Sequence, residues 1–227
     1  MARLRFPVVI GAGGLSILLA LGVWQVQRLS EKQALLAEID ARIAAPPVPL
    51  PAQPDPETDR YLAVAVTGRF VDAPHVRMLA SRRQIGAVHR HIAVFASDTA
   101  GRILVDIGWS PDDVAPPPLP SGPLTLMGNL DWPREADSFT PAPDISDGFW
   151  FARDVTEMAA AYDTNAILVV LRETPGAELG VTPWPVDTAG IPNNHLQYAI
   201  TWFSLAAIWT AMTAAFVWRN RRSGSAT

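Results

Sequence analysis

A run of twenty-three residues without charge, positions 196–218, constrains this chain more than any other feature. At ~1.5 Å per residue, a helix of that length spans about 34 Å, enough to cross a hydrocarbon core of about 30 Å. Arg219, Arg221 and Arg222 follow directly, which is typical of a spanning helix that emerges on the cytoplasmic side. We therefore predict a transmembrane segment at 192–218 and a cytoplasmic tail at 219–227.

A second charge-free run, residues 6–27, follows a short lead at residues 1–5 that carries Arg3 and Arg5. A cleaved signal peptide is the alternative, but the run exceeds the about 7–15 apolar residues of such a segment and lacks a small-x-small cleavage site. We therefore predict an uncleaved spanning helix, with both chain termini in the cytoplasm. Since no Arg- and Ser-rich presequence precedes it, the pattern favours a bacterial inner membrane, with the central residues in the periplasm.

The overall composition agrees with a few spanning helices and one domain outside the lipid bilayer. Hydrophobic residues make up 49% of the chain and its mean hydropathy is +0.15, values between those of soluble domains and polytopic transporters. All 22 acidic residues lie between Arg28 and His195, and no basic patch suggests a nucleic-acid partner. The absence of cysteine from the sequence excludes disulfides and thiolate metal sites.

The residues between the spans divide into a linker and a β-rich domain. Residues 28–60 begin with a predicted helical extension at 30–44, and six prolines between positions 46 and 56 then predict a stiff connector that does not pack. Residues 61–191 form the predicted β-rich domain, which opens at 61–67 with the period-two alternation of a half-buried strand. We predict one helix at 154–162, with Asp154 as N-cap and Glu157 completing a capping box. The predicted strands lie at 61–67, 75–79, 88–95, 102–107, 124–130 and 166–171.

The predicted fold is a membrane protein in which two transmembrane α-helices flank an outward-facing, β-rich α+β domain. Short strands with turn residues between them suit a small antiparallel barrel or sandwich, and the single short helix is an addition to it.

The candidate catalytic and metal-binding residues form no convincing set. His89 and His91 would share one face of a strand, but no third ligand accompanies them, so two imidazoles on a surface strand are the favoured interpretation. His75 has no partner in the sequence, and Asp112 and Asp113 fall in a proline-rich loop where solvated charge is expected. No nucleophile elbow and no pair of carboxylates stands out, so we predict no enzymatic activity.

The spans carry stripes of small and of aromatic residues. Small residues at four-residue spacing let membrane helices approach closely, so we predict packing through Ala12, Ser16, Ala20, Ala207, Ala211 and Ala215, and assign the glycines at 11–14 to close packing as well. The other stripe of the second span would face lipid, a ligand or another protein; it comprises His195, Tyr198, Trp202, Leu205, Trp209, Met212 and Phe216.

His195 heads this aromatic stripe at the outer end of the second span. One interpretation is an interfacial residue that bonds water or lipid headgroups and follows an N-cap at Asn193 or Asn194. The other is a ligand, since a neutral imidazole beside planar aromatic side chains suits the iron of a porphyrin, among other groups. The residues alone leave both open.

Several motifs resemble the surfeit locus protein 1 family. The run at 192–203, Pro-Asn-Asn-His-Leu-Gln-Tyr-Ala-Ile-Thr-Trp-Phe, is similar to the signature of that family, and the run at 22–28, Gly-Val-Trp-Gln-Val-Gln-Arg, resembles its motif at the end of the first helix, followed by Lys32. Related segments are expected at 67–70, 104–109 and 150–154. The chain departs from the family pattern at Glu31, where an aromatic is usual, and at Asp106 and Ile107, where Asn-Arg is usual.

This resemblance implies an assembly factor for haem-copper cytochrome c oxidase that assists haem a insertion into subunit I. It implies that haem a binds at the outer end of the two membrane helices, with His195 as the iron ligand. The implied cofactor-binding residues are His195, Tyr198, Trp202, Trp24, Gln25 and Arg28, with Arg28 able to pair with a propionate. The implied partners are cytochrome c oxidase subunit I, haem a synthase as a second candidate, and the lipid bilayer.

Two alternatives remain. The chain could be a cofactor-free membrane chaperone that holds subunit I through the aromatic face of the second helix. A haem-modifying enzyme is a third possibility, against which the missing acid–base and metal constellation argues.

Overall fold

Two long helices carry the charge-free runs of the sequence: α1 at Ala2–Ala44 and α3 at His195–Ser223. The computed structural model describes residues 2–72, 75–82, 85–114 and 118–223. The chain divides into two units, a helical unit formed by Met1–Glu38 with Thr188–Thr227, and a sheet unit formed by Ile39–Asp187. Each unit is described by itself.

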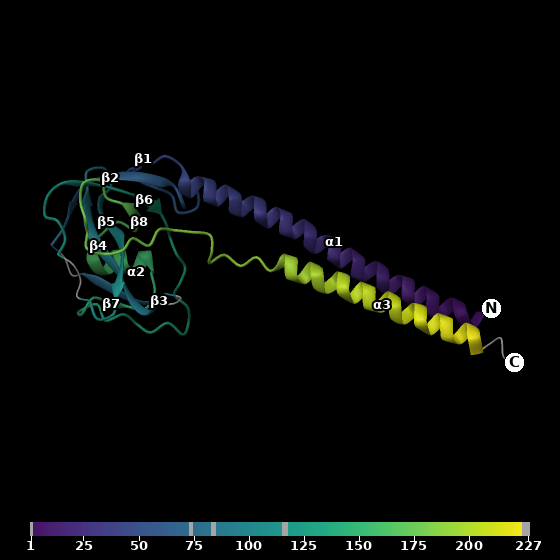
Figure 1. Cartoon of the computed structure of the whole chain (residues 1–227). Coiled ribbons are helices and arrows are strands. Elements are labelled where there is room, and N and C mark those ends of the chain that lie inside the picture. Colours follow the sequence, from purple (N-terminus) through teal and green to yellow (C-terminus); the bar gives the residue numbers. More distant parts are fainter. Residues whose placement is uncertain (1, 73–74, 83–84, 115–117, 224–227) are drawn as a thin grey trace. The chain divides into compact units, whose positions relative to one another are not determined.

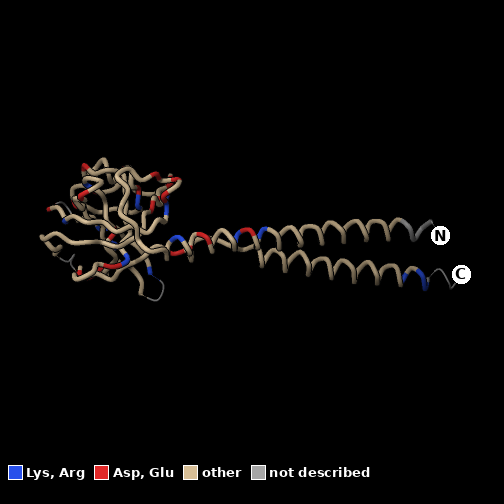
Figure 2. The backbone as a smooth tube through the Cα atoms, turned by 90° about the horizontal axis from the view of Figure 1, so that it is seen from above, with Lys and Arg blue, Asp and Glu red and all other residues tan. Residues whose placement is uncertain are grey.

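In the helical unit, α1 and α3 lie side by side and run in opposite directions, as both views show (Figures 1 and 2). Both helices, as Phe6–Ala44 and His195–Arg222, are long and apolar enough to cross a membrane, and only 11% and 6% of their most apolar windows are buried. The core helix of a soluble domain would cover most of its apolar side chains. Figure 2 shows the paired stretches of the two helices without blue or red, and in the sequence these charge-free runs are residues 6–27 and 196–218.

The helices pack through glycines of α1 that receive large side chains of α3. A Cβ built on Gly14 would lie 2.6 Å from the Trp209 ring, and one built on Gly22 would lie 2.6 Å from the Phe203 ring. Our prediction of packing through two alanine-rich faces was therefore wrong: Ala12, Ser16, Ala20, Ala207, Ala211 and Ala215 are all exposed. Two glycine notches offer more room for aromatic rings than two opposed alanine faces. Of the glycines at 11–14, Gly11 and Gly14 serve close packing as predicted, whereas Gly13 does not.

The sheet unit holds one eight-stranded sheet in the order β1-β2-β6-β8-β5-β4-β3-β7 (Figure 1). Because β2 also pairs with β4, the pairings β2–β6–β8–β5–β4–β2 form a closed circuit. The strands are β1 (Val48–Pro49), β2 (Ala63–Phe70), β3 (Val76–Arg82), β4 (Gly86–Ser97), β5 (Gly101–Pro111), β6 (Leu124–Leu130), β7 (Phe149–Trp150) and β8 (Leu168–Glu173).

The six predicted strands all exist, but the sheet is not wholly antiparallel. β5 pairs with β8 in parallel, as do β1 with β2 and β3 with β7. Parallel neighbours need a long crossover, and the chain between β5 and β8 supplies one through β6, β7 and α2 (Val155–Tyr162). The proline-rich connector also differs from its prediction, because Val48–Pro49 pairs with β2 and Leu50 is buried in the core.

The sheet has an apolar core on each face. Successive residues of β5 point to opposite sides, so Ile103 and Val105 enter one core while Leu104 enters the other. The second core is covered by α2, which buries Met158 completely. α2 begins as predicted at Asp154, whose side chain accepts a hydrogen bond from the Glu157 N–H at 2.9 Å.

Candidate functional site

The structure brings His195 and Gln25, which are 170 positions apart in sequence, into hydrogen-bond contact. His195 is the first residue of α3, and its Nδ1 lies 2.8 Å from Oε1 of Gln25. Gln25 lies on the face of α1 that packs against α3, one turn after Gly22, and is 8% exposed. The two sequence motifs therefore meet where the charge-free run of α1 ends and that of α3 begins.

Trp24, Arg28 and Tyr198 lie on one flank of the helix pair, close to His195 and Gln25 along the two helices. Helical rotation places Trp24 and Arg28 on the same side of Gln25, and it places Tyr198 on the matching side of the antiparallel α3. Trp24 and Tyr198 are each about half exposed. Arg28 is exposed and pairs with Glu31 at 2.6 Å, a contact between exposed groups that contributes little to stability.

The aromatic stripe predicted on α3 is divided between two roles. Trp202 is half-buried, and the Trp209 indole N–H donates to the Gly11 carbonyl at 2.9 Å. That bond explains a tryptophan in the middle of an apolar run, where interfacial preference alone does not. Tyr198, Leu205, Met212 and Phe216 remain exposed, so only part of the stripe is free to meet lipid, a ligand or another protein.

The start of α3 holds one unsatisfied polar atom. The Asn194 carbonyl accepts the Tyr198 N–H at 3.2 Å, so Asn194 occupies the N-cap position of the backbone. The side-chain oxygen of Asn193 is buried and has no hydrogen-bond partner within the described residues. A buried carbonyl oxygen without a donor is costly.

The sequence-predicted site residues therefore gather at one end of the helical unit, with different degrees of access. His195, Trp24, Arg28 and Tyr198 lie at the surface or half-buried, whereas Gln25 and Trp202 lie toward the helix interface. On this flank, an imidazole could ligate the iron of a porphyrin, a guanidinium could pair with a propionate, and two exposed aromatic rings could pack against the macrocycle.

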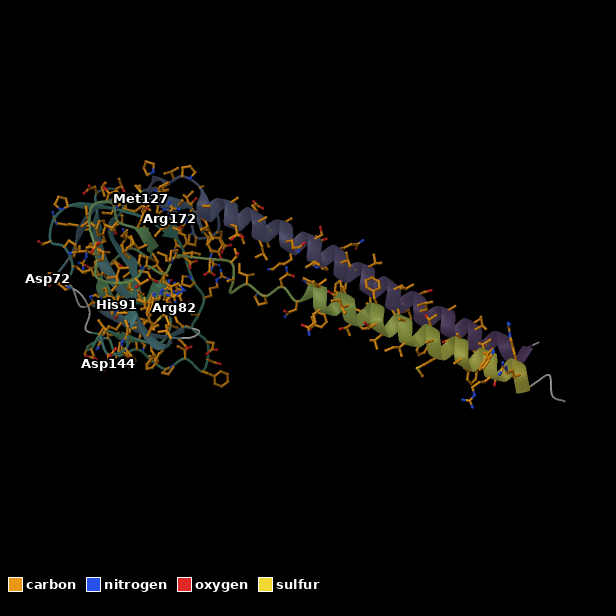
Figure 3. All side chains as sticks on the ribbon, in the orientation of Figure 1. Asp72, Arg82, His91, Met127, Asp144 and Arg172 are labelled. Atoms are coloured by element: carbon orange, nitrogen blue, oxygen red, sulfur yellow. The ribbon has the colours of Figure 1, made fainter. Side chains whose placement is uncertain are left out.

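The histidines of the sheet unit form a different arrangement from the one predicted. His91, labelled in Figure 3, is fully buried rather than on a surface strand, and its Nδ1 lies 3.1 Å from Nε2 of His75. Its Nε2 lies 2.7 Å from the Ser110 hydroxyl. His75 therefore has a partner that the sequence did not reveal, because β3 and β4 pair in a register that brings His91 beside the start of β3. His89 instead lies 3.3 Å from Asp112.

Burial governs the protonation of this histidine pair. Desolvation, with the nearby His75, His89 and Arg77, lowers the pKa of His91 to about 4. Burial and the charge of Arg77 also lower the pKa of His75. Among the described residues, no group of three or more His, Asp and Glu side chains is placed to hold a metal ion. The pair is best explained as a neutral hydrogen-bonded element of the core.

Sequence reasoning missed a buried charge network centred on Asp106. The Asp106 carboxylate is inaccessible and accepts hydrogen bonds from Arg90 and from Arg153, the latter at 3.3 Å. Arg153 also pairs with Glu135. Burial acts to raise the pKa of Glu135, but the hydrogen bond and charge of Arg153 hold this pKa below its usual range. The only signal in the sequence was the departure from the family pattern at Asp106 and Ile107, where Asn-Arg is usual.

Comparisons with known proteins agree with the motifs. A family model described as the SURF1 family matches residues 14–207. Surfeit locus protein 1 of Xenopus tropicalis is 30% identical over 217 residues, covering 84% of this chain and 69% of the relative. The rat protein of that name is 29% identical, over 82% of this chain and 68% of the relative. A SURF1-like protein of Rickettsia bellii is 27% identical over 201 residues, covering 84% of this chain and 82% of the relative.

Proposed function

Because this chain belongs to the SURF1 family, we propose that it is a membrane-bound assembly factor for cytochrome c oxidase that binds haem a on its way to subunit I. The observation that carries the proposal is the contact of His195 with Gln25, which joins the two motif-bearing helix ends into one site. Family membership supports the assembly role, and the donor set at this site supports the cargo.

The proposed site lies at the outer surface of a bacterial inner membrane. The two apolar helices support spanning segments at 6–27 and 192–218, and the arginines after Trp218 support a cytoplasmic C-terminus. Residues 61–191 would then form a periplasmic domain, and the closed circuit of strand pairings supports a small barrel. The SURF1-like relative from Rickettsia bellii supports a bacterial setting.

Each residue of the site has a role that its position supports. His195 would ligate the iron, Trp24 and Tyr198 would lie against the macrocycle, and Arg28 would exchange Glu31 for a propionate. The bound haem would supply no chemistry to this chain, because here it is cargo rather than a working cofactor. An exposed flank suits such cargo, since the acceptor must reach it. Trp202, at the helix interface, would support the surface formed by Trp24 and Tyr198.

Absorption spectra test the proposal. The chain, co-expressed with haem a biosynthesis and purified in detergent, should carry haem a pigment, and His195→Ala should lose most of it. Thr201→Ala on the same helix, whose hydroxyl only bonds the Gln197 carbonyl, serves as a matched control that should retain the pigment. Equal pigment in the His195→Ala variant and the wild type would contradict ligation by His195.

A cofactor-free chaperone remains the second candidate, supported by the exposed side chains of α3. Met212 and Phe216 are 65% and 51% exposed. Met212→Ala with Phe216→Ala should reduce co-purification of subunit I and leave the pigment unchanged if that face holds subunit I. Trp209 is unsuitable for this test, because its indole bonds α1. Unchanged co-purification would exclude the face as a subunit I contact.

A further inference from the structure

We infer that Gln25 is a positioning residue that sets the tautomer of His195 and leaves Nε2 as the nitrogen able to bind a metal. The inference rests on the proposed function for the identity of the metal group, but the tautomer itself is a property of the chain alone. It assigns to Gln25 a role through His195, in place of direct contact with the cofactor.

The hydrogen bond determines where the imidazole proton lies. An amide oxygen can only accept, so the contact of Gln25 Oε1 with His195 Nδ1 at 2.8 Å places the proton on Nδ1. A neutral imidazole carries one ring proton, and Nε2 then presents a lone pair. The imidazole of His195 makes no other hydrogen bond to the described residues. A ligating histidine is commonly oriented in this way, by a partner on its second nitrogen.

The location of Gln25 explains why the partner is held in place. Gln25 is 8% exposed and lies on the α1 face between Gly22 and Leu29, whereas its neighbours Trp24 and Val26 are exposed. Packing against α3 restricts the amide, and it can hold His195 only while the two helices are paired. The positioning function therefore depends on the helix interface.

A neutral hydrogen-bond acceptor such as the Gln25 amide also suits an iron-ligating histidine that must later release the haem. A carboxylate on Nδ1 raises the basicity of a ligating imidazole and strengthens its metal bond, and it would need to be desolvated at this interface. An amide fixes the same tautomer without adding charge. Glutamine therefore combines orientation with a weaker hold, and Gln25→Glu should retain haem a longer than the wild type.

Nitrogen NMR of the haem-free, full-length chain tests the inference directly. With ¹⁵N-labelled histidine, the wild type should show His195 protonated on Nδ1 and unprotonated on Nε2, the signal being assigned by its loss in His195→Ala. In Gln25→Leu the Nδ1–H form should give way to the Nε2–H form. Gln27→Leu, a change at an exposed position two residues along, should leave the spectrum as in the wild type. A wild-type His195 protonated on Nε2 would overturn the inference.

The haem affinity of the loaded protein provides a second test of the inference. Loss of an outer-shell partner lowers metal affinity by about 10–100-fold, so Gln25→Leu should bind haem a that much more weakly, with Gln27→Leu unchanged. Unchanged affinity in Gln25→Leu, together with loss of pigment in His195→Ala, would overturn the inference. Full pigment in His195→Ala would instead defeat the proposed ligation, while the NMR result would still decide the role of Gln25.

Discussion

Asp106 and His91 show at the residue scale how this chain keeps polar groups inside the sheet unit. Asp106 is 1% exposed and is bonded by two arginines, and Arg90 also lies over the Trp184 ring at 4.7 Å while donating to the Trp184 carbonyl at 3.1 Å. The network thus joins β4, β5 and the segment around Trp184. Ionised groups are tolerated there because each is paired, and removing one partner leaves the others buried and uncompensated.

Asp106→Asn should destabilise the sheet unit strongly. The substitution leaves the guanidinium groups of Arg90 and Arg153 buried with one fewer counter-charge, a loss of about 3–5 kcal/mol for a broken buried pair. Chemical denaturation of the full chain in detergent, followed by tryptophan fluorescence, measures the change. Asp163→Asn is the matched control, because its side chain is 95% exposed beside Arg102 and its loss should leave the midpoint unchanged. Equal midpoints for both variants would contradict the proposed importance of the network.

His91 should make the sheet unit less stable at acidic pH. Its pKa is about 4 in the folded protein against 6.5 in the unfolded chain, so between these values only the unfolded chain binds the proton. Stability is therefore fully present above pH 6.5 and is lost as the pH falls toward 4. The lowered pKa of His75 acts in the same direction. The denaturation midpoint at pH 5 should lie below that at pH 7.5, and His91→Gln should reduce the difference.

At the element scale, the register of α1 and α3 is set by glycines that accept specific side chains. Gly11 faces Thr213, Gly14 faces Trp209 and Gly22 faces Phe203, and these contacts occur in opposite order along the two helices. Gly13 differs, since a Cβ built on it meets no described atom within 4 Å. The same register brings Gln25 to His195, so the geometry of the candidate site depends on these notches.

Gly14→Ala should weaken the helix pairing, whereas Gly13→Ala should not. Both changes raise helix propensity by about 1 kcal/mol, but only the first places a methyl group against the Trp209 ring. Oxidative cross-linking of a Gly11→Cys and Thr213→Cys pair can report the pairing, because the built Gly11 Cβ lies 3.3 Å from the Thr213 Cβ. Cross-linking should be several-fold slower with Gly14→Ala than with Gly13→Ala. Equal rates would show that the notch does not set the register.

At the scale of the whole molecule, the chain joins a helical unit to a sheet unit by two segments, the end of α1 and the stretch after Asp187. The end of α1 belongs to the sheet unit: the Asn129 amide donates to the Ile43 carbonyl at 3.0 Å, satisfying one of the free carbonyls at the helix end. If both helices span the membrane, the sheet unit and the chain termini lie on opposite sides.

Cysteine labelling tests this topology, and the chain suits it because it contains no cysteine. Ser138→Cys lies at an exposed position of the sheet unit, and Asn220→Cys lies after the apolar run of α3. In intact bacterial spheroplasts, a membrane-impermeant maleimide should label the first variant at once and the second only after the membrane is permeabilised. Immediate labelling of Asn220→Cys would contradict a cytoplasmic C-terminus.

The sequence by itself determined the elements whose signal is local. The charge-free runs predicted the two long helices, period-two alternation predicted the strand at 61–67, and Asp154 predicted the start of α2, because periodicity and capping depend on residues within a few positions. The motifs also named the candidate site residues, whose role stays a prediction. The two-residue strands β1 and β7 are too short to carry a period, so they could not be found.

Only the tertiary structure decided how distant residues meet. By their spacing, the alanine stripes were a plausible packing face, but the glycines of α1 form the interface. A glycine notch is recognised only together with the ring that fills it. The parallel pairing of β5 with β8, the His75–His91 contact and the Asp106 network depend in the same way on strand register. The contact between His195 and Gln25 is also of this kind: the sequence placed both residues at helix ends, and packing made them partners.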